Sequence, residues 1–346
     1  MTGSSNTVGR VSVFAAATGI GSWPGTSARQ AAEIVVGELH TLPHLVELPA
    51  RGVGADLIGR TGALLVDIGI DTVARSYRIA PGRSSVLRRA VSMLNEDLDA
   101  LEEAWEKAGL RGSGRPVKVQ AAGPFTLAAQ LELANGHRAI TDTGALRDLA
   151  GSLAEGLGTH RAEVARRLGT EVVVQLDEPS LPDALAGRLA GVTSLSPVAA
   201  LDEQVAAALL DDCVGALGGA VALHSCAPEL PWKLLQRSRL PALSVDVSTL
   251  NAGDLDGVGE FVESGRTVLL GVIPGTAQQR RWEPEHVAKA AAAVTDRLGF
   301  GRSVLRERIG ITPACGLAGA TEQWARTAIG LVQKASDGLA VDPDGI

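Results

Sequence analysis

The chain has 346 residues and a formal net charge of −7, which comes from 39 acidic and 32 basic residues. The charges form no basic run, and aromatic residues make up only 3% of the chain, so nucleic acid is not expected as the main partner. No apolar run approaches the roughly 18 residues that span a membrane, and no secretory signal opens the chain, so we expect no membrane partner and a soluble, cytoplasmic protein.

Short β-branched segments alternate with longer segments of helical period, which is the pattern of a parallel sheet with crossover helices. The expected strands are residues 13–20, 42–47, 117–122, 171–176, 220–223, 242–245, 267–272 and 309–312. The expected helices are residues 27–39, 85–108, 143–168, 201–215, 231–237, 254–264, 284–298 and 321–335. Eight such pairs predict an α/β fold with a single (β/α)₈ TIM barrel.

The barrel is expected to span residues 11–337, with flexible ends at residues 1–10 and 338–346. After the second strand, residues 51–79 are mixed in character and predict a small excursion that holds a helix and a hairpin at Tyr77. Two doubly wound halves split near residue 180 would also fit the length, but no linker-like stretch lies there.

Chemically distinctive side chains follow these predicted strands. They are Ser22, Glu47, Asp177, Glu178, His224, Cys226, Asp246 and Cys315. In a TIM barrel the loops after the strands carry the active site. Their shared position therefore predicts one functional site at that end of the barrel.

A metal site is the first interpretation of this set. His224 and Cys226 stand two apart on an extended segment, so their side chains point to the same side and can bind one ion. Alone, this pair is more often a core histidine beside an inert cysteine. Cys315 ends the last strand and Asp246 ends another, so the four residues predict a Zn²⁺ site. Three cysteines, an odd number, also argue against a disulfide framework.

The predicted zinc ligands favour alkyl transfer to sulfur, because a bound thiol is held as a thiolate nucleophile, whereas hydrolytic sites use more histidine and carboxylate. Residues 19–24 offer backbone N–H groups and the Ser22 hydroxyl to a carboxylate, although a tight glycine turn is an equal interpretation. Glu47 and Asp177 could hold an ammonium group, the alternative being solvated surface carboxylates. Together these groups describe a site for a small amino acid.

Four motifs resemble, in order and rough spacing, the C-terminal catalytic barrel of cobalamin-independent methionine synthase. They are Gly19-Ile-Gly-Ser-Trp-Pro24, Gln175-Leu-Asp-Glu-Pro179, His224-Ser-Cys226 and Pro313-Ala-Cys-Gly-Leu317. The resemblance implies a (β/α)₈ barrel that methylates homocysteine at a zinc ion held by His224, Cys226 and Cys315. It also implies substrate-binding roles for Ile20, Gly21, Ser22, Glu47 and Asp177. We take Asp177 and Glu178 as the catalytic candidates.

The sequence also departs from that family. Asp246 stands where the family has a glutamate ligand, and residues 272–276, Val-Ile-Pro-Gly-Thr, lack the histidine that is thought to protonate a folate leaving group. A tryptophan-bearing segment is replaced by Leu127-Ala-Ala-Gln-Leu131. Full-length relatives have a second, N-terminal barrel of similar size, and we expect none in this chain. These departures suggest that the methyl donor is methylcobalamin or a corrinoid protein instead of methyltetrahydrofolate.

Three other functions are alternatives for the same barrel. Uroporphyrinogen decarboxylase needs an arginine-rich N-terminal segment, and residues 18–30 contain only Arg29. A corrinoid-linked methyltransferase that uses another thiol acceptor shares the His-x-Cys pair and the late cysteine. A non-catalytic barrel that binds zinc and an amino acid is the third alternative.

Overall fold

The computed structural model describes residues 11–74, 76–193 and 197–346, and its main feature is a curled parallel sheet. In order across the sheet, the strands are β3 (Val117–Ala122), β5 (Val172–Asp177), β6 (Val221–Ser225), β7 (Ala242–Asp246), β8 (Thr267–Ile273) and β9 (Ile309–Pro313). These six strands match six of the eight that the sequence predicts.

Two extended segments take the places of the first and second predicted strands. Isolated parallel bridges join Ala17 to Ile311 on β9, Ser22 to Glu47, and His44 to Lys118 on β3. The ring of eight segments is thereby closed, and the predicted TIM barrel is confirmed. The first two segments make bridges instead of regular ladders, and Pro43 explains part of this, because it accepts a bond from Lys118 N at 2.8 Å but has no N–H to donate.

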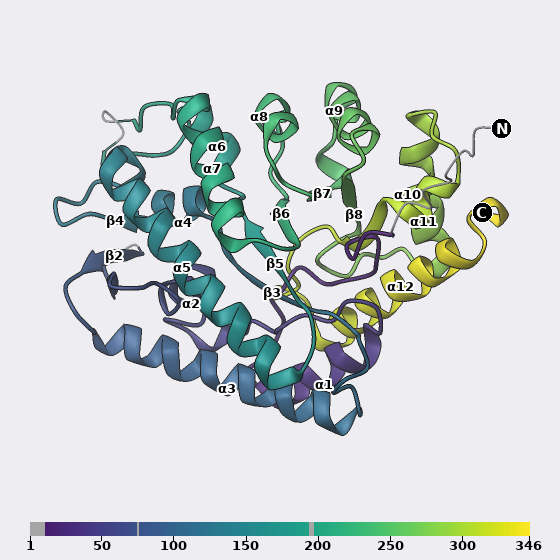
Figure 1. Ribbon diagram of the computed structural model, residues 1–346, viewed down its shortest axis with the longest axis horizontal. Coiled ribbons are helices and arrows are strands. Elements are labelled where there is room, and N and C mark those ends of the chain that lie inside the picture. The colour runs from purple at the N-terminus through teal and green to yellow at the C-terminus, as the bar shows by residue number, and fades with distance from the viewer. Residues whose placement is uncertain (1–10, 75, 194–196) are drawn as a thin grey trace, which may run out of the picture.

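Helices surround the strands (Figure 1). The eight predicted helices are confirmed as α1 (Ala28–Glu38), α3 (Ser85–Lys107), α5 (Thr143–Leu168), α7 (Glu203–Leu217), α8 (Trp232–Arg237), α9 (Ala252–Glu263), α10 (Pro284–Arg297) and α12 (Glu322–Val341). Side chains cap many of their first turns, as Ser27 does for α1 and Thr321 for α12. Within the described residues, no helix is long and apolar enough to cross a membrane.

Shorter elements were not predicted. They are α4 (Pro124–Gln130), β4 (Leu131–Glu132), α6 (Leu181–Leu185) and α11 (Ser303–Glu307), together with the 3₁₀ turns η1 (Pro49–Arg51), η2 (Ala139–Thr141), η3 (Val247–Thr249) and η4 (Pro343–Gly345). The boundary placed at residue 337 falls inside α12, and residues 1–10 lie outside the described residues.

The excursion after the second segment contains the expected helix and hairpin. Helix α2 (Leu57–Gly62) precedes strands β1 (Gly69–Thr72) and β2 (Tyr77–Ala80), which pair antiparallel, and β4 joins β2 in parallel. The Tyr77 hydroxyl ties the hairpin to α2: it donates to Asp56, which caps the helix, and accepts from Gly54 N at 2.7 Å. This packing fixes α2 beside the barrel mouth.

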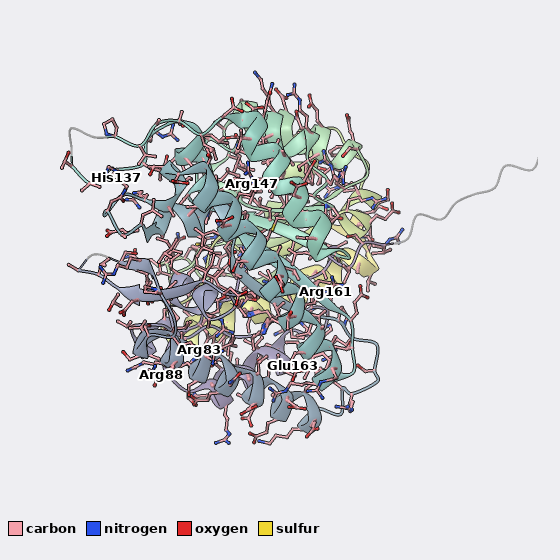
Figure 2. All side chains as sticks on the ribbon, turned by 60° about the vertical axis from the view of Figure 1, so that its left-hand side comes forward. Arg83, Arg88, His137, Arg147, Arg161 and Glu163 are labelled. Carbon is pink, nitrogen blue, oxygen red and sulfur yellow. The ribbon has the colours of Figure 1, made fainter. Side chains whose placement is uncertain are left out.

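The barrel interior changes from apolar to polar along its axis. A small apolar cluster fills one level of the interior with Phe14, Leu42, Val173, Ala222, Ala242 and Leu269. Toward the carboxyl ends, in-register neighbours share the inner face, and they are polar: Gln120 with Gln175, Asp177 with His224, and His224 with Ser244. Other charged side chains lie on the outer helices, such as Arg147 and Glu163 on α5 (Figure 2). The interior polar residues are therefore a separate, enclosed set.

Candidate active site

The structure brings His224, Cys226 and Cys315 together at the carboxyl end of the barrel. One potential ligand atom from each lies within 4.8 Å of the others, and the two Sγ atoms are 3.0 Å apart. His224 is buried, its Nδ1 lies 3.0 Å from Ser244 Oγ, and its Nε2 is buried without a hydrogen-bond partner. A metal-ligating histidine commonly engages a second group through its other ring nitrogen, as His224 does here.

A hydrogen bond between the two thiols shifts their pKa values in opposite directions. The hydrogen bond with Cys226 is the main reason that the pKa of Cys315 falls to about 4. The same hydrogen bond, together with burial, raises the pKa of Cys226. Ionising the second thiol beside the first needs a nearby cation. The donor set therefore fits a thiophilic divalent cation such as Zn²⁺.

Asp246, the predicted fourth ligand, is not brought into this group of three. Its carboxylate Oδ1 accepts from Ser248 N at 2.8 Å and from Ser248 Oγ at 2.7 Å, and so caps η3. These bonds engage Oδ1 alone, so Oδ2 is the oxygen that could bind an ion, and the side chain would have to bring it within reach of the three other ligands. Its role as a ligand stays a prediction.

A pocket of about 330 Å³ opens beside the three potential ligands. The other predicted site residues that line it are Ile20, Ser22, Glu47 and Asp177. Pro49, Leu57, Pro179 and a turn at residues 316–319 add mostly apolar surface. The volume and the lining suit a small amino acid with an apolar or thioether side chain.

Glu47 and Asp177 are buried carboxylates, and the ion pair that Glu47 forms with Arg60 is a long one. Glu47 is 4% exposed, its Oε1 has no hydrogen-bond partner, and Arg60 Nε lies 3.9 Å from that oxygen. Asp177 is 6% exposed and accepts from Gln175 Nε2 at 2.7 Å. Burial raises the pKa of both groups, and for Asp177 the nearby Glu47 carboxylate adds to the effect. A nearby ammonium group would favour the ionised form of both carboxylates, and their role in binding such a group stays a prediction.

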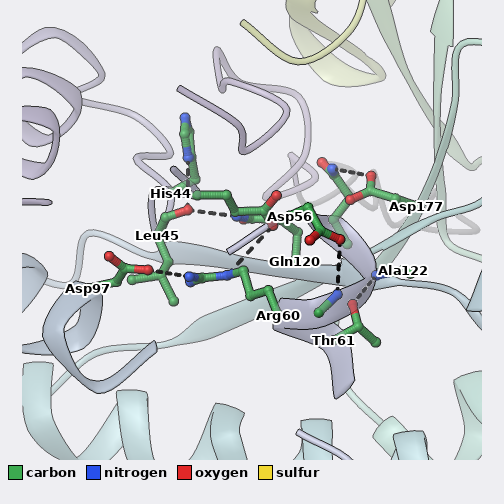
Figure 3. A network of polar contacts seen from close by, with 12 residues as sticks. His44, Leu45, Asp56, Arg60, Thr61, Asp97, Gln120, Ala122 and Asp177 are labelled. Atoms are coloured by element: carbon green, nitrogen blue, oxygen red, sulfur yellow. Dashed lines mark hydrogen bonds and ion pairs between the residues drawn. The ribbon is translucent and has the colours of Figure 1, made fainter. Parts of the chain in front are cut away.

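Two buried charged residues, Arg60 and Asp97, lie next to each other (Figure 3), and Arg60 also forms the long ion pair with Glu47. Asp97, which is 0% exposed, accepts from Arg51 at 2.6 and 2.7 Å and from Arg60, so it holds Arg60 near Glu47. Sequence reasoning missed this group, since Asp97 looks like an ordinary polar position of a long helix. It also missed Lys118, Gln120 and Gln175. The sequence does carry a signal for these three residues, because they are polar residues within strands that are otherwise apolar and buried.

Segment 19–22 is built into the barrel in ways that its sequence does not reveal. The Ile20 carbonyl accepts from Lys118 Nζ at 2.9 Å and from Gln175 Nε2 at 2.8 Å, so its lone pairs are engaged within the protein. Gly21 has a φ of +152°, and a Cβ there would lie 2.7 Å from Gln120 Nε2, so a larger residue would clash. Gly21 does not line the pocket, whereas Ser22 does.

The buried Glu178 side chain binds the first turn of helix α4. Its side chain is 0% exposed and accepts from Phe125 N at 2.9 Å, Thr126 N at 2.8 Å and Thr126 Oγ1 at 2.7 Å, which anchors the first turn of α4. Burial raises the pKa of Glu178 to about 7 despite these bonds. Glu178 is not among the residues that line the pocket, and its catalytic role stays a prediction.

We expect Glu178→Gln to lower the free energy of unfolding by about 1–3 kcal/mol, because an amide has a single accepting oxygen and would leave one buried donor facing its NH₂ group. Urea unfolding of the zinc-loaded protein measures the change, and exposed Glu155→Gln is the control. Loss of methylation in Glu178→Gln at unchanged stability would instead support a catalytic role.

A parallel barrel whose strands end in thiol, imidazole and carboxylate groups around one pocket has the architecture of a barrel enzyme. The family model of the cobalamin-independent synthase catalytic domain matches residues 14–337. The chain belongs to this family.

Solved structures with the same fold include two at low sequence identity. A B12-independent methionine synthase from Shewanella sp. W3-18-1, in complex with selenomethionine, aligns with a TM-score of 0.61 at 12% identity, over 96% of this chain and 100% of that one. A protein from Listeria monocytogenes described as a vitamin-B12 independent methionine synthase aligns with a TM-score of 0.57 at 14% identity, over 93% and 96%. No curated protein matches the sequence. At these identities the structural likeness shows the fold alone.

Proposed function

We propose that this protein is a zinc-dependent methyltransferase that transfers a methyl group to the thiol of homocysteine and so forms methionine. One observation carries the proposal: the ligand atoms of His224, Cys226 and Cys315 lie within 4.8 Å of one another, beside a pocket that Glu47 and Asp177 also line. A thiol-binding metal centre and an ammonium-binding site thus share one small cavity. Membership of the synthase family and the selenomethionine bound to the Shewanella enzyme support this substrate.

Different residues of this chain would bind the metal, the ammonium group and the carboxylate group. His224, Cys226 and Cys315 would hold the zinc ion, and Asp246 remains our prediction for a fourth ligand. Zinc bound here would lower the pKa of a coordinated substrate thiol, so that sulfur is a thiolate at neutral pH. Glu47 and Asp177 bind the ammonium group, Ser22 offers its hydroxyl to the carboxylate, and Leu57 and Pro179 limit access of water to the pocket.

We propose further that the donor is methylcobalamin or a corrinoid protein. Methyl transfer from methyltetrahydrofolate forms the S–C bond and breaks an N–C bond, and the departing nitrogen must gain a proton from an acid. Transfer from a methylated corrinoid breaks a Co–C bond, and the metal-centred leaving group needs no proton. Among the described residues, the pocket is lined by a single histidine, His224, which we assign to the metal.

The methyl donor can be identified by comparing initial rates with two donors. Zinc-loaded protein with homocysteine should form methionine faster from methylcobalamin than from methyltetrahydrofolate, measured as initial rates at equal donor concentration. A folate rate equal to or above the corrinoid rate would contradict the donor assignment and mean that another acid protonates the folate. Tight homocysteine binding without turnover from either donor would favour a non-catalytic barrel, and turnover with other thiols alone would favour another acceptor.

A further inference from the structure

Lys118 is a fully buried lysine beneath the pocket, and the binding roles proposed above leave it unused. It lies on β3, is 0% exposed, and donates from Nζ to the Ile20 carbonyl at 2.9 Å and to Gln175 Oε1 at 2.6 Å. Both acceptors are neutral, and Lys118 takes part in no ion pair within the described part of the chain. A buried ammonium held in this way is poorly compensated.

The number of hydrogen bonds fits the neutral amine. A neutral lysine amine has two N–H groups and an ammonium has three. The two bonds of Lys118 therefore use both N–H groups of the amine, and they leave one proton of the ammonium without an acceptor. The charged form has its own support in Glu47 and Asp177, whose carboxylates act on Lys118 through space. Burial outweighs them and lowers the pKa of Lys118 to about 7, so both forms are accessible near neutral pH.

A continuous set of contacts joins Lys118 to the pocket. Gln175 accepts from Lys118 and donates from Nε2 both to the Ile20 carbonyl and to Asp177 Oδ1. Asp177 and Ile20 line the pocket. The charge on Nζ and the charge in the pocket therefore belong to one buried cluster.

A third titratable neighbour of Lys118, besides Glu47 and Asp177, is His44, which does not change its charge near neutral pH. His44 lies opposite Lys118 on the bridged segment 44–47, and burial lowers the pKa of His44 to about 3, so it stays neutral. Glu47 comes from the same segment and Asp177 from β5. Segment 17–22 contributes the Ile20 carbonyl and no charged side chain.

We propose that Lys118 is an exchangeable counter-charge of the amino-acid site: its ammonium balances Glu47 and Asp177 while the pocket is empty, and it releases its proton to solvent when a substrate ammonium binds there. The inference rests on the proposed function, because it requires an amino acid at these carboxylates. A second cation in the same buried cluster is unfavourable, and loss of the Lys118 proton removes that repulsion. Lys118 is thus a positioning residue that sets the charge of the site without touching the reacting atoms.

The affinity of the site for the amino acid should depend on pH. Where Lys118 is protonated in the free protein, binding must expel that proton, so affinity for the amino acid falls as the pH falls. Where Lys118 is already neutral, no proton is expelled, and this group adds no further pH dependence. Affinity should therefore rise as the pH increases through the pKa of Lys118.

The experiment uses the zinc-loaded full chain with lysine labelled by ¹³C at Cε, and L-methionine as the ligand. Methionine carries the ammonium and carboxylate but no thiol, so a released proton cannot come from its sulfur. The chain has only four other lysines, Lys107, Lys233, Lys289 and Lys334, and all four are exposed. Single Lys→Arg substitutions at these four positions assign the Lys118 signal by elimination, without altering the site.

We expect the Lys118 signal to titrate near neutral pH in the free protein and to move to the neutral-amine position when methionine is added, while the other four signals stay unchanged. Calorimetry in two buffers of different ionisation enthalpy should show a net release approaching about one proton per methionine on the acid side of the Lys118 titration, and Lys118→Met should abolish the release.

Two results would overturn the inference and leave the proposed function standing: methionine binding with an unmoved Lys118 signal, or proton release that persists in Lys118→Met and so belongs to Glu47 or Asp177. Absence of any methionine or homocysteine binding would overturn both. If Lys118→Met does not fold, the labelled wild-type protein decides alone.

Discussion

Cys226→Ser and Cys315→Ser should each lose the bound zinc and all homocysteine methylation, while Cys213→Ser keeps both. Serine nearly preserves the size of the side chain but removes the thiolate, and the two Sγ atoms at 3.0 Å are two of the three potential ligand atoms that the described structure brings together. Loss of an outer contact to a metal ligand already weakens metal binding roughly 10–100-fold, so loss of a ligand itself should exceed that. Zinc content after dialysis against a mild chelator is the measurement.

Cys213 is the matched control because it has the same chemistry in a different place. It lies on α7, is 3% exposed, and burial raises its pKa to about 12, so it remains a protonated thiol. Full zinc content in Cys226→Ser or in Cys315→Ser, or its loss in Cys213→Ser, would contradict the assignment. Far-UV circular dichroism of each variant separates loss of the metal from loss of the fold.

The barrel could be predicted from the sequence because hydrophobic period is a local property. The six runs that became strands of the sheet, and the eight predicted helices, each carry their own signal within a few residues. The two segments that close the barrel were predicted as strands but formed bridges, since Pro43 limits one ladder and glycines at residues 19 and 21 break the β-branched pattern of the other. Ring closure depends on contacts between residues 17 and 311, which no local pattern encodes.

The candidate site was predicted to the extent that its residues stand directly after strands. His224, Cys226, Cys315, Glu47 and Asp177 share that position, and the structure brings them to one pocket. The supporting charges could not be found in the same way, because Arg60 and Asp97 come from α2 and α3, where charged residues are ordinary surface positions. These two charged residues become buried, and come within reach of each other, only when the helices pack against the barrel.

Asp177→Asn should weaken homocysteine binding by roughly tenfold or more and leave zinc in place. Asp177 Oδ1 accepts from Gln175, and an asparagine oxygen can keep that bond, which turns its NH₂ group toward the position of the second carboxylate oxygen. The substrate ammonium would then meet a donor instead of an anion. A hydrogen bond to a charged group contributes about 1.5–3 kcal/mol, and about 1.4 kcal/mol corresponds to a tenfold change in affinity.

Glu47→Gln should act in the same direction, because Glu47 Oε1 accepts no hydrogen bond within the described residues and its ion pair with Arg60 is long, at 3.9 Å, so this oxygen can accept from the ammonium. Exposed Asp183→Asn, which removes a surface ion pair with Arg188, is the control and should leave affinity unchanged. Calorimetric titration with homocysteine gives the affinities, and metal analysis gives the zinc content. Unchanged affinity in both Asp177→Asn and Glu47→Gln would show that the ammonium binds elsewhere, and zinc loss in either variant would show that the carboxylate supports the metal instead.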